Sequence, residues 1–152
     1  MNTEKQVTNT DEETRKLGFD FAKRLKPGDV VALYGGLGAG KTEFLKGVCD
    51  FFKVDEIITS PTFTIMNKYF GEYDGGEITI FHIDLYRIKS PKELQDIGFQ
   101  ECVFSDSSIK LIEWADKSGG NLPDDRFNVK INLGKDNEDE RIFEFYYGKD
   151  SE

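Results

Sequence analysis

The sequence predicts one α/β domain over residues 1–152, with a mixed, mostly parallel sheet that is flanked by helices and followed by a C-terminal antiparallel hairpin. An apolar run at residues 29–34 leads through a glycine-rich turn into a stretch with helical periodicity, which is typical of a buried strand followed by a helix. Residues 127–133 and 141–147 instead alternate apolar and polar side chains, which indicates two antiparallel strands around a polar turn. A length of 152 residues fits a single domain with a substantial core.

The first helix is predicted by a start signal, an apolar face and a stop signal. Thr10 and Glu13 have the spacing of a capping box, in which the Thr side chain accepts from an early backbone N–H and the Glu reaches back. Apolar residues then recur at helical spacing from Leu17 to Leu25, and Pro27-Gly28 ends the helix.

The remaining elements follow from similar signals. After the strand at residues 29–34 we expect a helix at 41–52, strands at 63–70 and 77–84 joined by the turn Asp74-Gly75-Gly76, a short helix at 91–95, and an apolar strand at 109–114. The hairpin strands at 127–133 and 141–147 complete the sheet.

Composition excludes several classes of protein. The net charge of −9 argues against DNA as a partner and against independent binding of nucleic-acid backbones, which usually requires a basic face. Cys49 and Cys102 match no metal-site spacing and are too few for a disulfide scaffold, so we expect reduced thiols and a cytoplasmic protein. No secretory leader and no membrane-spanning run is evident, so we expect no membrane association.

The motif that carries chemistry is a phosphate-binding loop, which begins at Gly35 and ends in Gly40-Lys41-Thr42. Its glycines let successive backbone N–H groups converge on phosphate oxygens, and the helix that follows adds the positive end of its dipole. Lys41 brings a full positive charge to the β- and γ-phosphates, and the Thr42 hydroxyl is a ligand for Mg²⁺. The fold is therefore expected to be P-loop NTPase-like. The expected nucleotide-binding residues are Gly36, Leu37, Gly38, Ala39, Gly40, Lys41 and Thr42.

Proteins with such a loop usually hold Mg²⁺ through a second acid at the end of a neighbouring apolar strand. Two acids qualify: Glu113 ends the run at residues 109–113, and Asp84 ends the run at residues 78–84. Glu113 follows the cleaner buried-strand pattern. Asp84 is then expected to contact the metal through water or to orient the attacking water. The residues alone leave the choice of principal metal acid open.

Four motifs in this order resemble the TsaE (YjeE) family, the bacterial ATPase of tRNA threonylcarbamoyladenosine (t6A) biosynthesis. They are the P-loop GGLGAGKT at residues 35–42, SPTFT at 60–64, HIDLYR at 82–87 and IEW at 112–114. Weaker similarity extends from Glu13 to the hairpin near Arg141, so the resemblance covers nearly the whole chain. The P-loop alone is shared by many families, whereas the combination is far more specific.

The resemblance implies a P-loop ATPase, weak alone and stimulated by its partners, the TsaD and TsaB subunits of the t6A complex. ATP and Mg²⁺ are the implied cofactors, and tRNA is contacted indirectly through the complex. By motif, the implied catalytic residues are Lys41, Thr62, Asp84 and Glu113, and the implied metal ligands are Thr42 and Glu113. Trp114 is expected to close the site or face a partner, while Thr10 and Arg141 are expected to flank the nucleotide.

Two positions depart from the family pattern. Gly36 stands where the family usually has Asp, and Glu43 stands where it tends to have a small hydroxyl residue. A carboxylate in the first helical turn suits the helix dipole, but it repels phosphate if it turns inward. Both departures bear on nucleotide affinity and hydrolysis rate.

Other functions remain open from the residues. A small-molecule P-loop kinase usually carries an arginine-bearing lid, and the arginines of this chain are not clustered. The third possible function is a nucleotide-gated interaction module that does not hydrolyse its nucleotide. His82, the only histidine, is expected to be a satisfied strand residue, since no Cys–His metal cluster can be assembled around it.

Overall fold

The computed structural model describes residues 3–35, 40–58, 65–135 and 137–149. In chain order its elements are β1 (Glu4–Thr8), α1 (Asp11–Ala22), β2 (Val30–Tyr34), α2 (Lys41–Phe51), β3 (Met66–Tyr73), β4 (Gly76–Asp84), α3 (Glu93–Asp96), α4 (Phe99–Val103), β5 (Ser108–Glu113), the 3₁₀ helix η1 (Ala115–Ser118), β6 (Phe127–Leu133) and β7 (Arg141–Tyr147).

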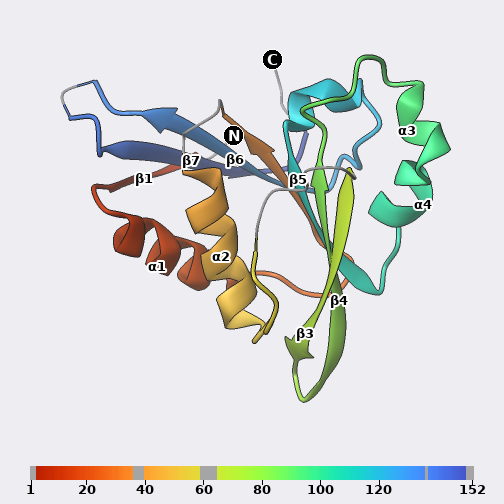
Figure 1. Ribbon diagram of the computed structural model, residues 1–152, viewed down its shortest axis with the longest axis horizontal. Helices are drawn as coiled ribbons and strands as arrows, with labels where there is room; N and C mark the ends of the chain where they lie inside the picture. Colours follow the sequence, from red (N-terminus) through yellow and green to blue (C-terminus); the bar gives the residue numbers. More distant parts are fainter. Residues whose placement is uncertain (1–2, 36–39, 59–64, 136, 150–152) are drawn as a thin grey trace.

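Within the described residues, seven strands form one mixed sheet in the order β1-β7-β6-β2-β5-β4-β3 (Figure 1). Its four central strands, β6, β2, β5 and β4, run parallel, while β1, β7 and β3 are added antiparallel at the two sides. The mixed α/β architecture and the C-terminal antiparallel hairpin are therefore confirmed.

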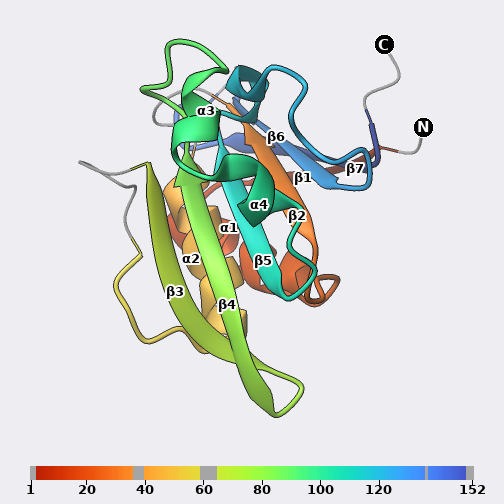
Figure 2. The ribbon, with the colours of Figure 1, turned by 90° about the vertical axis from the view of Figure 1, so that its right-hand side faces the viewer.

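Helices cover both faces of the sheet. In Figure 2 the helices α3 and α4 lie in front of the parallel strands, and α1 and α2 lie behind them. Each face has its own apolar core, and β2 supplies both: Val31 and Leu33 pack toward α1 and α2, whereas Val30 and Ala32 pack toward α3 and α4. A strand buried on both faces favours apolar residues at successive positions, and residues 30–33 form such an unbroken apolar run.

The capping box at the start of α1 is present. The Glu13 backbone N–H donates to Thr10 Oγ1 at 3.0 Å, and the Glu13 carboxylate accepts from the Asn9 backbone N–H at 2.7 Å. One unpaired backbone donor of the first helical turn is thus satisfied by the Thr10 side chain, while Glu13 reaches back to the residue that precedes the cap.

Helices α1 and α2 pack unusually closely because each presents a glycine to the other's backbone. A Cβ built on Gly18 would lie 2.1 Å from the Phe44 carbonyl oxygen, and one built on Gly47 would lie 1.9 Å from the Arg15 carbonyl oxygen. Neither position has room for a side chain. This contact fixes α2 against α1 and so fixes the helix that starts at the predicted phosphate loop.

The hairpin turn between β3 and β4 is confirmed. Tyr73 pairs with Gly76, and the two residues between them, Asp74 and Gly75, have φ angles of 50° and 80°. Two positive φ angles are typical of a type I′ turn, whose twist matches the flanking strands, and Asp-Gly is among the sequences that favour it.

Several element boundaries differ from the sequence expectations. Strand β1 was not predicted, and neither was α4. The short helix begins at Glu93 rather than at residue 91, and β5 ends at Glu113, which leaves Trp114 outside the strand. Strand β3 begins at Met66; residues 63–64 of the expected strand lie outside the described part of the chain.

Among the helices of the described residues, none combines the length and the apolar character needed to cross a bilayer.

Candidate nucleotide-binding site

The predicted phosphate loop joins the end of β2 to the start of α2. Gly40 precedes the helix with φ 91°, a left-handed conformation that favours glycine, and Lys41 is the first helical residue. The N-terminal backbone N–H groups of α2 therefore open toward the carboxyl ends of the parallel strands, where ligands bind in open α/β sheets. The loop residues Gly36, Leu37, Gly38 and Ala39 lie outside the described residues, as does Thr62.

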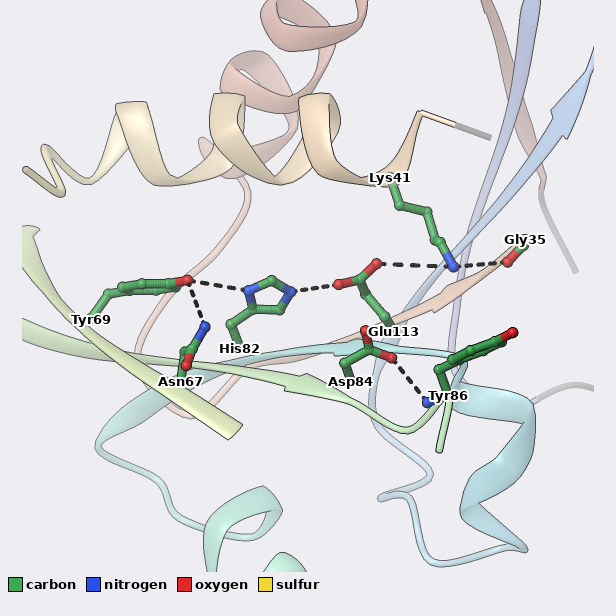
Figure 3. A network of polar contacts seen from close by, with 8 residues as sticks. All are labelled: Gly35, Lys41, Asn67, Tyr69, His82, Asp84, Tyr86 and Glu113. Carbon is green, nitrogen blue, oxygen red and sulfur yellow. Dashed lines mark hydrogen bonds and ion pairs between the residues drawn. The ribbon is translucent and has the colours of Figure 1, made fainter. Parts of the chain in front are cut away.

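Lys41 is buried at the centre of this region, with 6% of its surface exposed. Its Nζ donates to the Gly35 carbonyl at 2.9 Å and lies 3.9 Å from Glu113 Oε1 (Figure 3). The same Nζ lies 4.2 Å from the centroid of the Trp114 ring, within cation–π range. Burial lowers the Lys41 pKa, and the neighbouring charges of Glu113, Asp84 and Asp116 oppose that shift.

The two predicted acids lie side by side on the sheet. Asp84 pairs with Glu113 in the parallel register of β4 and β5, and both belong to the strand positions that face α2. Glu113 is 2% exposed, whereas Asp84 is only partly buried. Burial raises the Asp84 pKa and the Glu113 charge adds to this, although Asp84 Oδ1 also accepts a hydrogen bond from the Tyr86 backbone N–H at 2.9 Å. The structure thus brings both candidates to the Lys41 side of the sheet.

Thr42 follows Lys41 in the first turn of α2 and is partly buried. Its hydroxyl and the two carboxylates are oxygen donors of the kind that Mg²⁺ prefers. Within the described part of the chain, however, no group of three or more His, Cys, Asp or Glu residues could hold a metal ion by itself. This donor set fits a cation that takes its remaining ligands from phosphates and water, as Mg²⁺ commonly does in nucleotide sites.

Trp114 turns the chain sharply at the end of β5. Its φ of 57° and ψ of 44° are left-handed, an uncommon conformation for a bulky residue. The ring packs against Tyr86, with centroids 5.0 Å apart, and on the Lys41 ammonium group. Backbone strain of this kind concentrates at functional sites, and here it places an aromatic wall beside the predicted phosphate position.

Thr10 and Arg141 come together beside the loop, although they are far apart in sequence. The pairing of β1 with β7 places Thr8 opposite Arg141, and Thr10 follows at the start of α1. Both residues line a pocket of about 260 Å³ together with Asn9, Asp11, Thr14, Gly40 and Asp139. A Cβ built on Gly40 would lie 3.7 Å from Arg141 Cγ, so the arginine side chain lies against the end of the phosphate loop.

Glu43 turns away from the phosphate loop. Its carboxylate pairs with Arg15 at 2.9 Å and with Lys46 at 3.2 Å. Burial acts to raise the Glu43 pKa, but the hydrogen bonds from Lys46 and Arg15 outweigh it and the pKa is lowered. The carboxylate is thus held on the outer surface of α1 and α2, which removes the repulsion expected for an inward orientation. Gly36, the other departure, lies outside the described residues.

Sequence reasoning missed one partner of the site. His82 is 1% exposed, and its Nε2 lies 2.6 Å from Glu113 Oε2. The signal was available, because side chains alternate along a strand and His82 stands two residues before Asp84, on the same face. The expectation that His82 is a satisfied strand residue agrees with this burial, but its contact with Glu113 was not foreseen.

Comparisons with known proteins agree on one family. The profile described as threonylcarbamoyl adenosine biosynthesis protein TsaE matches residues 8–143. The tRNA threonylcarbamoyladenosine biosynthesis protein TsaE of Treponema pallidum (strain Nichols) is 38% identical over 127 residues, which are 84% of this chain and 88% of the relative. The protein of the same name from Bacillus subtilis (strain 168) is 39% identical over 132 residues, which are 87% of this chain and 79% of the relative.

A solved structure has the same fold. The crystal structure of Bacillus subtilis YdiB superposes with a TM-score of 0.75 at 33% sequence identity, covering 97% of this chain and 86% of that chain. The similarity therefore extends over the sheet, the helices on both of its faces and the C-terminal hairpin.

Proposed function

This chain belongs to the TsaE family of tRNA threonylcarbamoyladenosine biosynthesis proteins, and from that membership we propose that its P-loop site binds and hydrolyses ATP in support of t6A formation. The observation that carries the proposal is the convergence of Lys41, Asp84 and Glu113 beside the N-terminus of α2. A buried cation, an array of backbone N–H groups and two carboxylates form the set that phosphoryl transfer to water requires.

Each described residue has a role in the proposed reaction. Lys41 exchanges the Gly35 carbonyl for phosphate oxygens, because an ammonium group forms stronger hydrogen bonds with an anion than with a neutral carbonyl. Thr42 and Glu113 hold Mg²⁺, which supplies charge neutralisation to the phosphates when bound. Asp84, at the adjacent strand end, orients the attacking water.

We assign the part of the nucleotide beyond its phosphates to the pocket that Thr10 and Arg141 line. The Arg141 guanidinium supplies positive charge next to Gly40, and the Thr10 hydroxyl, which already accepts from Glu13, retains a proton to donate. Trp114, whose ring lies against Lys41, excludes water from the ammonium group.

The proposed partners are TsaD and TsaB, with tRNA contacted through their complex. The test is a phosphate-release assay on the isolated chain, repeated with TsaD, TsaB and tRNA added one at a time. We expect slow release alone and faster release with the partners. A phosphorylated small-molecule product would instead support a kinase, and ATP binding without release under every condition would support a nucleotide-gated module.

A further inference from the structure

The His82 ring is buried behind the acid that we assign to the metal, and it is bonded on both sides. Nε2 lies 2.6 Å from Glu113 Oε2, and Nδ1 makes a longer contact of 3.4 Å with the Tyr69 hydroxyl. The ring is 1% exposed and Tyr69 is 5% exposed. Figure 3 shows these groups in a row that runs from the edge strand β3 through β4 to β5 and Lys41.

The chemistry of Glu113 fixes the direction of the hydrogen bond that it shares with His82. A carboxylate only accepts hydrogen bonds, so His82 Nε2 must carry the proton that it shares with Glu113. The Asn67 side-chain N–H donates to the Tyr69 oxygen at 3.3 Å, and the Tyr69 hydroxyl can itself donate to His82 Nδ1. With its proton on Nε2, the ring donates to Glu113 and can accept from Tyr69.

The two oxygens of Glu113 consequently have different surroundings. Oε2 is held by His82, while Oε1 faces Lys41 at 3.9 Å. We propose that His82 is a positioning residue, which fixes the Glu113 carboxylate so that Oε1 is presented to the nucleotide-bound cation. This inference rests on the proposed function, since it assigns a purpose to the orientation of the metal acid.

Outer hydrogen-bond partners of this kind orient ligating carboxylates, and their loss usually weakens metal affinity by about 10- to 100-fold. Glu113 has several rotatable side-chain bonds, so without an anchor its carboxylate would sample several orientations. The register of the sheet supports the assignment: His82 pairs with Leu111 and Asp84 with Glu113, which puts the ring one side-chain position behind the acid on the same face.

The first test measures binding of a non-hydrolysable ATP analogue by calorimetry, in EDTA and over a range of Mg²⁺ concentrations. For His82→Leu we expect the Mg²⁺ concentration at half-maximal enhancement to rise about 10- to 100-fold. Affinity in EDTA should change by less than about threefold, because Lys41 and the α2 N-terminus are untouched. His82→Gln should restore most of the Mg²⁺ response, since its side-chain amide N–H can replace the Nε2 donor.

Ile80→Val is the matched control. Ile80 is buried on the same strand and face as His82, so this change should lower the melting temperature slightly and leave the Mg²⁺ response as in the wild type. In the Glu113→Ala background, His82→Leu should have no further effect on the Mg²⁺ response, because the residue acts only through Glu113.

The second test does not use His82→Leu, so it holds even where that variant does not fold. His82 is the only histidine, and ¹H–¹⁵N NMR of its ring requires no assignment. We expect a protonated Nε2 whose chemical shift moves in Glu113→Gln. An Nε2 without a proton, or equal losses of affinity with and without Mg²⁺ in His82→Leu, would overturn the inference.

The proposed metal site and the proposed role of His82 can be disproved separately. If the ATP affinity of the wild-type protein does not depend on Mg²⁺, the proposed metal site is wrong. A wild type that responds to Mg²⁺, beside an equally responsive His82→Leu variant, would overturn only the role of His82.

Discussion

Glu113 and Asp84 are two carboxylates at the ends of adjacent strands, but their surroundings differ. Glu113 is almost fully buried and is held between His82 and Lys41. Asp84 is partly buried and accepts from the Tyr86 backbone. The more rigidly held carboxylate is the better metal ligand, because a preorganised donor loses less conformational freedom when the cation binds.

Glu113→Ala should therefore blunt the Mg²⁺ dependence of ATP binding more than Asp84→Ala does. Asp84→Ala should instead lower the hydrolysis rate at saturating Mg²⁺, since its assigned role is to orient water. Calorimetry at graded Mg²⁺ and a phosphate-release assay separate the two effects. The reverse ranking would make Asp84 the principal metal acid.

Lys41→Ala removes the cation that we assign to the β- and γ-phosphates. We expect ATP affinity to fall about 10- to 100-fold, since a hydrogen bond to a charged group contributes about 1.5–3 kcal/mol. Lys46→Ala is the matched control from the same helix, because Lys46 pairs with Glu43 on the outer surface. Wild-type hydrolysis by Lys41→Ala would show that the site has been assigned wrongly.

Asp84 also makes the fold itself sensitive to pH. Its pKa is raised in the folded protein, chiefly by burial, so the folded state binds this proton more tightly than the unfolded chain does. Stability is therefore lost as pH rises from the ordinary carboxyl pKa of 3.8 through the raised value, and the loss is complete above it. Asp84→Asn should raise the melting temperature at pH 7 and raise it less toward pH 4, while activity falls. A melting temperature at pH 7 at or below the wild-type value would contradict this account.

Much of the site could be predicted at the level of residues. The phosphate-loop pattern predicted Lys41, and the two acids were predicted because each ends an apolar strand; the structure brings the three residues together. The contact of His82 with Glu113 required the register of β4 against β5, which depends on pairing between segments far apart in sequence. The turn of Glu43 toward Arg15 likewise depends on how α1 and α2 pack.

At the scale of elements, the close contact between α1 and α2 connects packing with the site. Gly18 and Gly47 let the two backbones touch, and Phe44, whose carbonyl lies against Gly18, follows Lys41 within the first turn of α2. Any separation of the helices therefore also displaces the start of α2 from the carboxyl ends of β4 and β5.

Gly47→Ala should destabilise the fold by about 1–3 kcal/mol or more, because the new methyl group would overlap the Arg15 carbonyl and the helices would have to move apart. Urea unfolding measures the loss, and ATP affinity should fall with it. Gly76→Ala serves as the control, since a Cβ there would come no closer than 3.8 Å to another group. Equal stabilities for the two variants would show that the contact is loose.

The elements that could be predicted are those whose own residues form a recognisable local pattern. Helix α1 has its capping box, and β2 has its apolar run. Strand β1 has neither: Glu4 to Val7 are exposed and mostly polar, and only Thr8 is buried. Its strand conformation comes from hydrogen bonding to β7, so it depends on an element more than 130 residues away along the chain.

At the scale of the whole molecule, charge limits the partners that this chain can bind alone. It carries 29 acidic residues against 20 Lys and Arg, for a net charge of −9. Contacts to the phosphate backbone of a nucleic acid depend on basic side chains that displace counterions. A protein with an excess of acidic residues repels these phosphates overall. Contact with tRNA through protein partners is consistent with this balance.

The isolated chain should therefore bind tRNA more weakly than about 10⁻⁴ M at physiological salt, the weak end of non-specific affinity. Fluorescence anisotropy with labelled tRNA measures this, and raising the salt concentration should change the signal little. Micromolar affinity with a steep salt dependence would reveal a basic surface that the net charge conceals.

The pocket beside Gly40 has a consequence for the order in which the protein is made. One wall comes from residues 9–14 and another from Asp139 and Arg141, so the ribosome makes the first wall well before the second. The phosphate loop and both acids are translated earlier than the second wall. A nascent chain can thus form the centre of the site before it can form this pocket. Completion of this pocket consequently waits until Arg141 has left the ribosome.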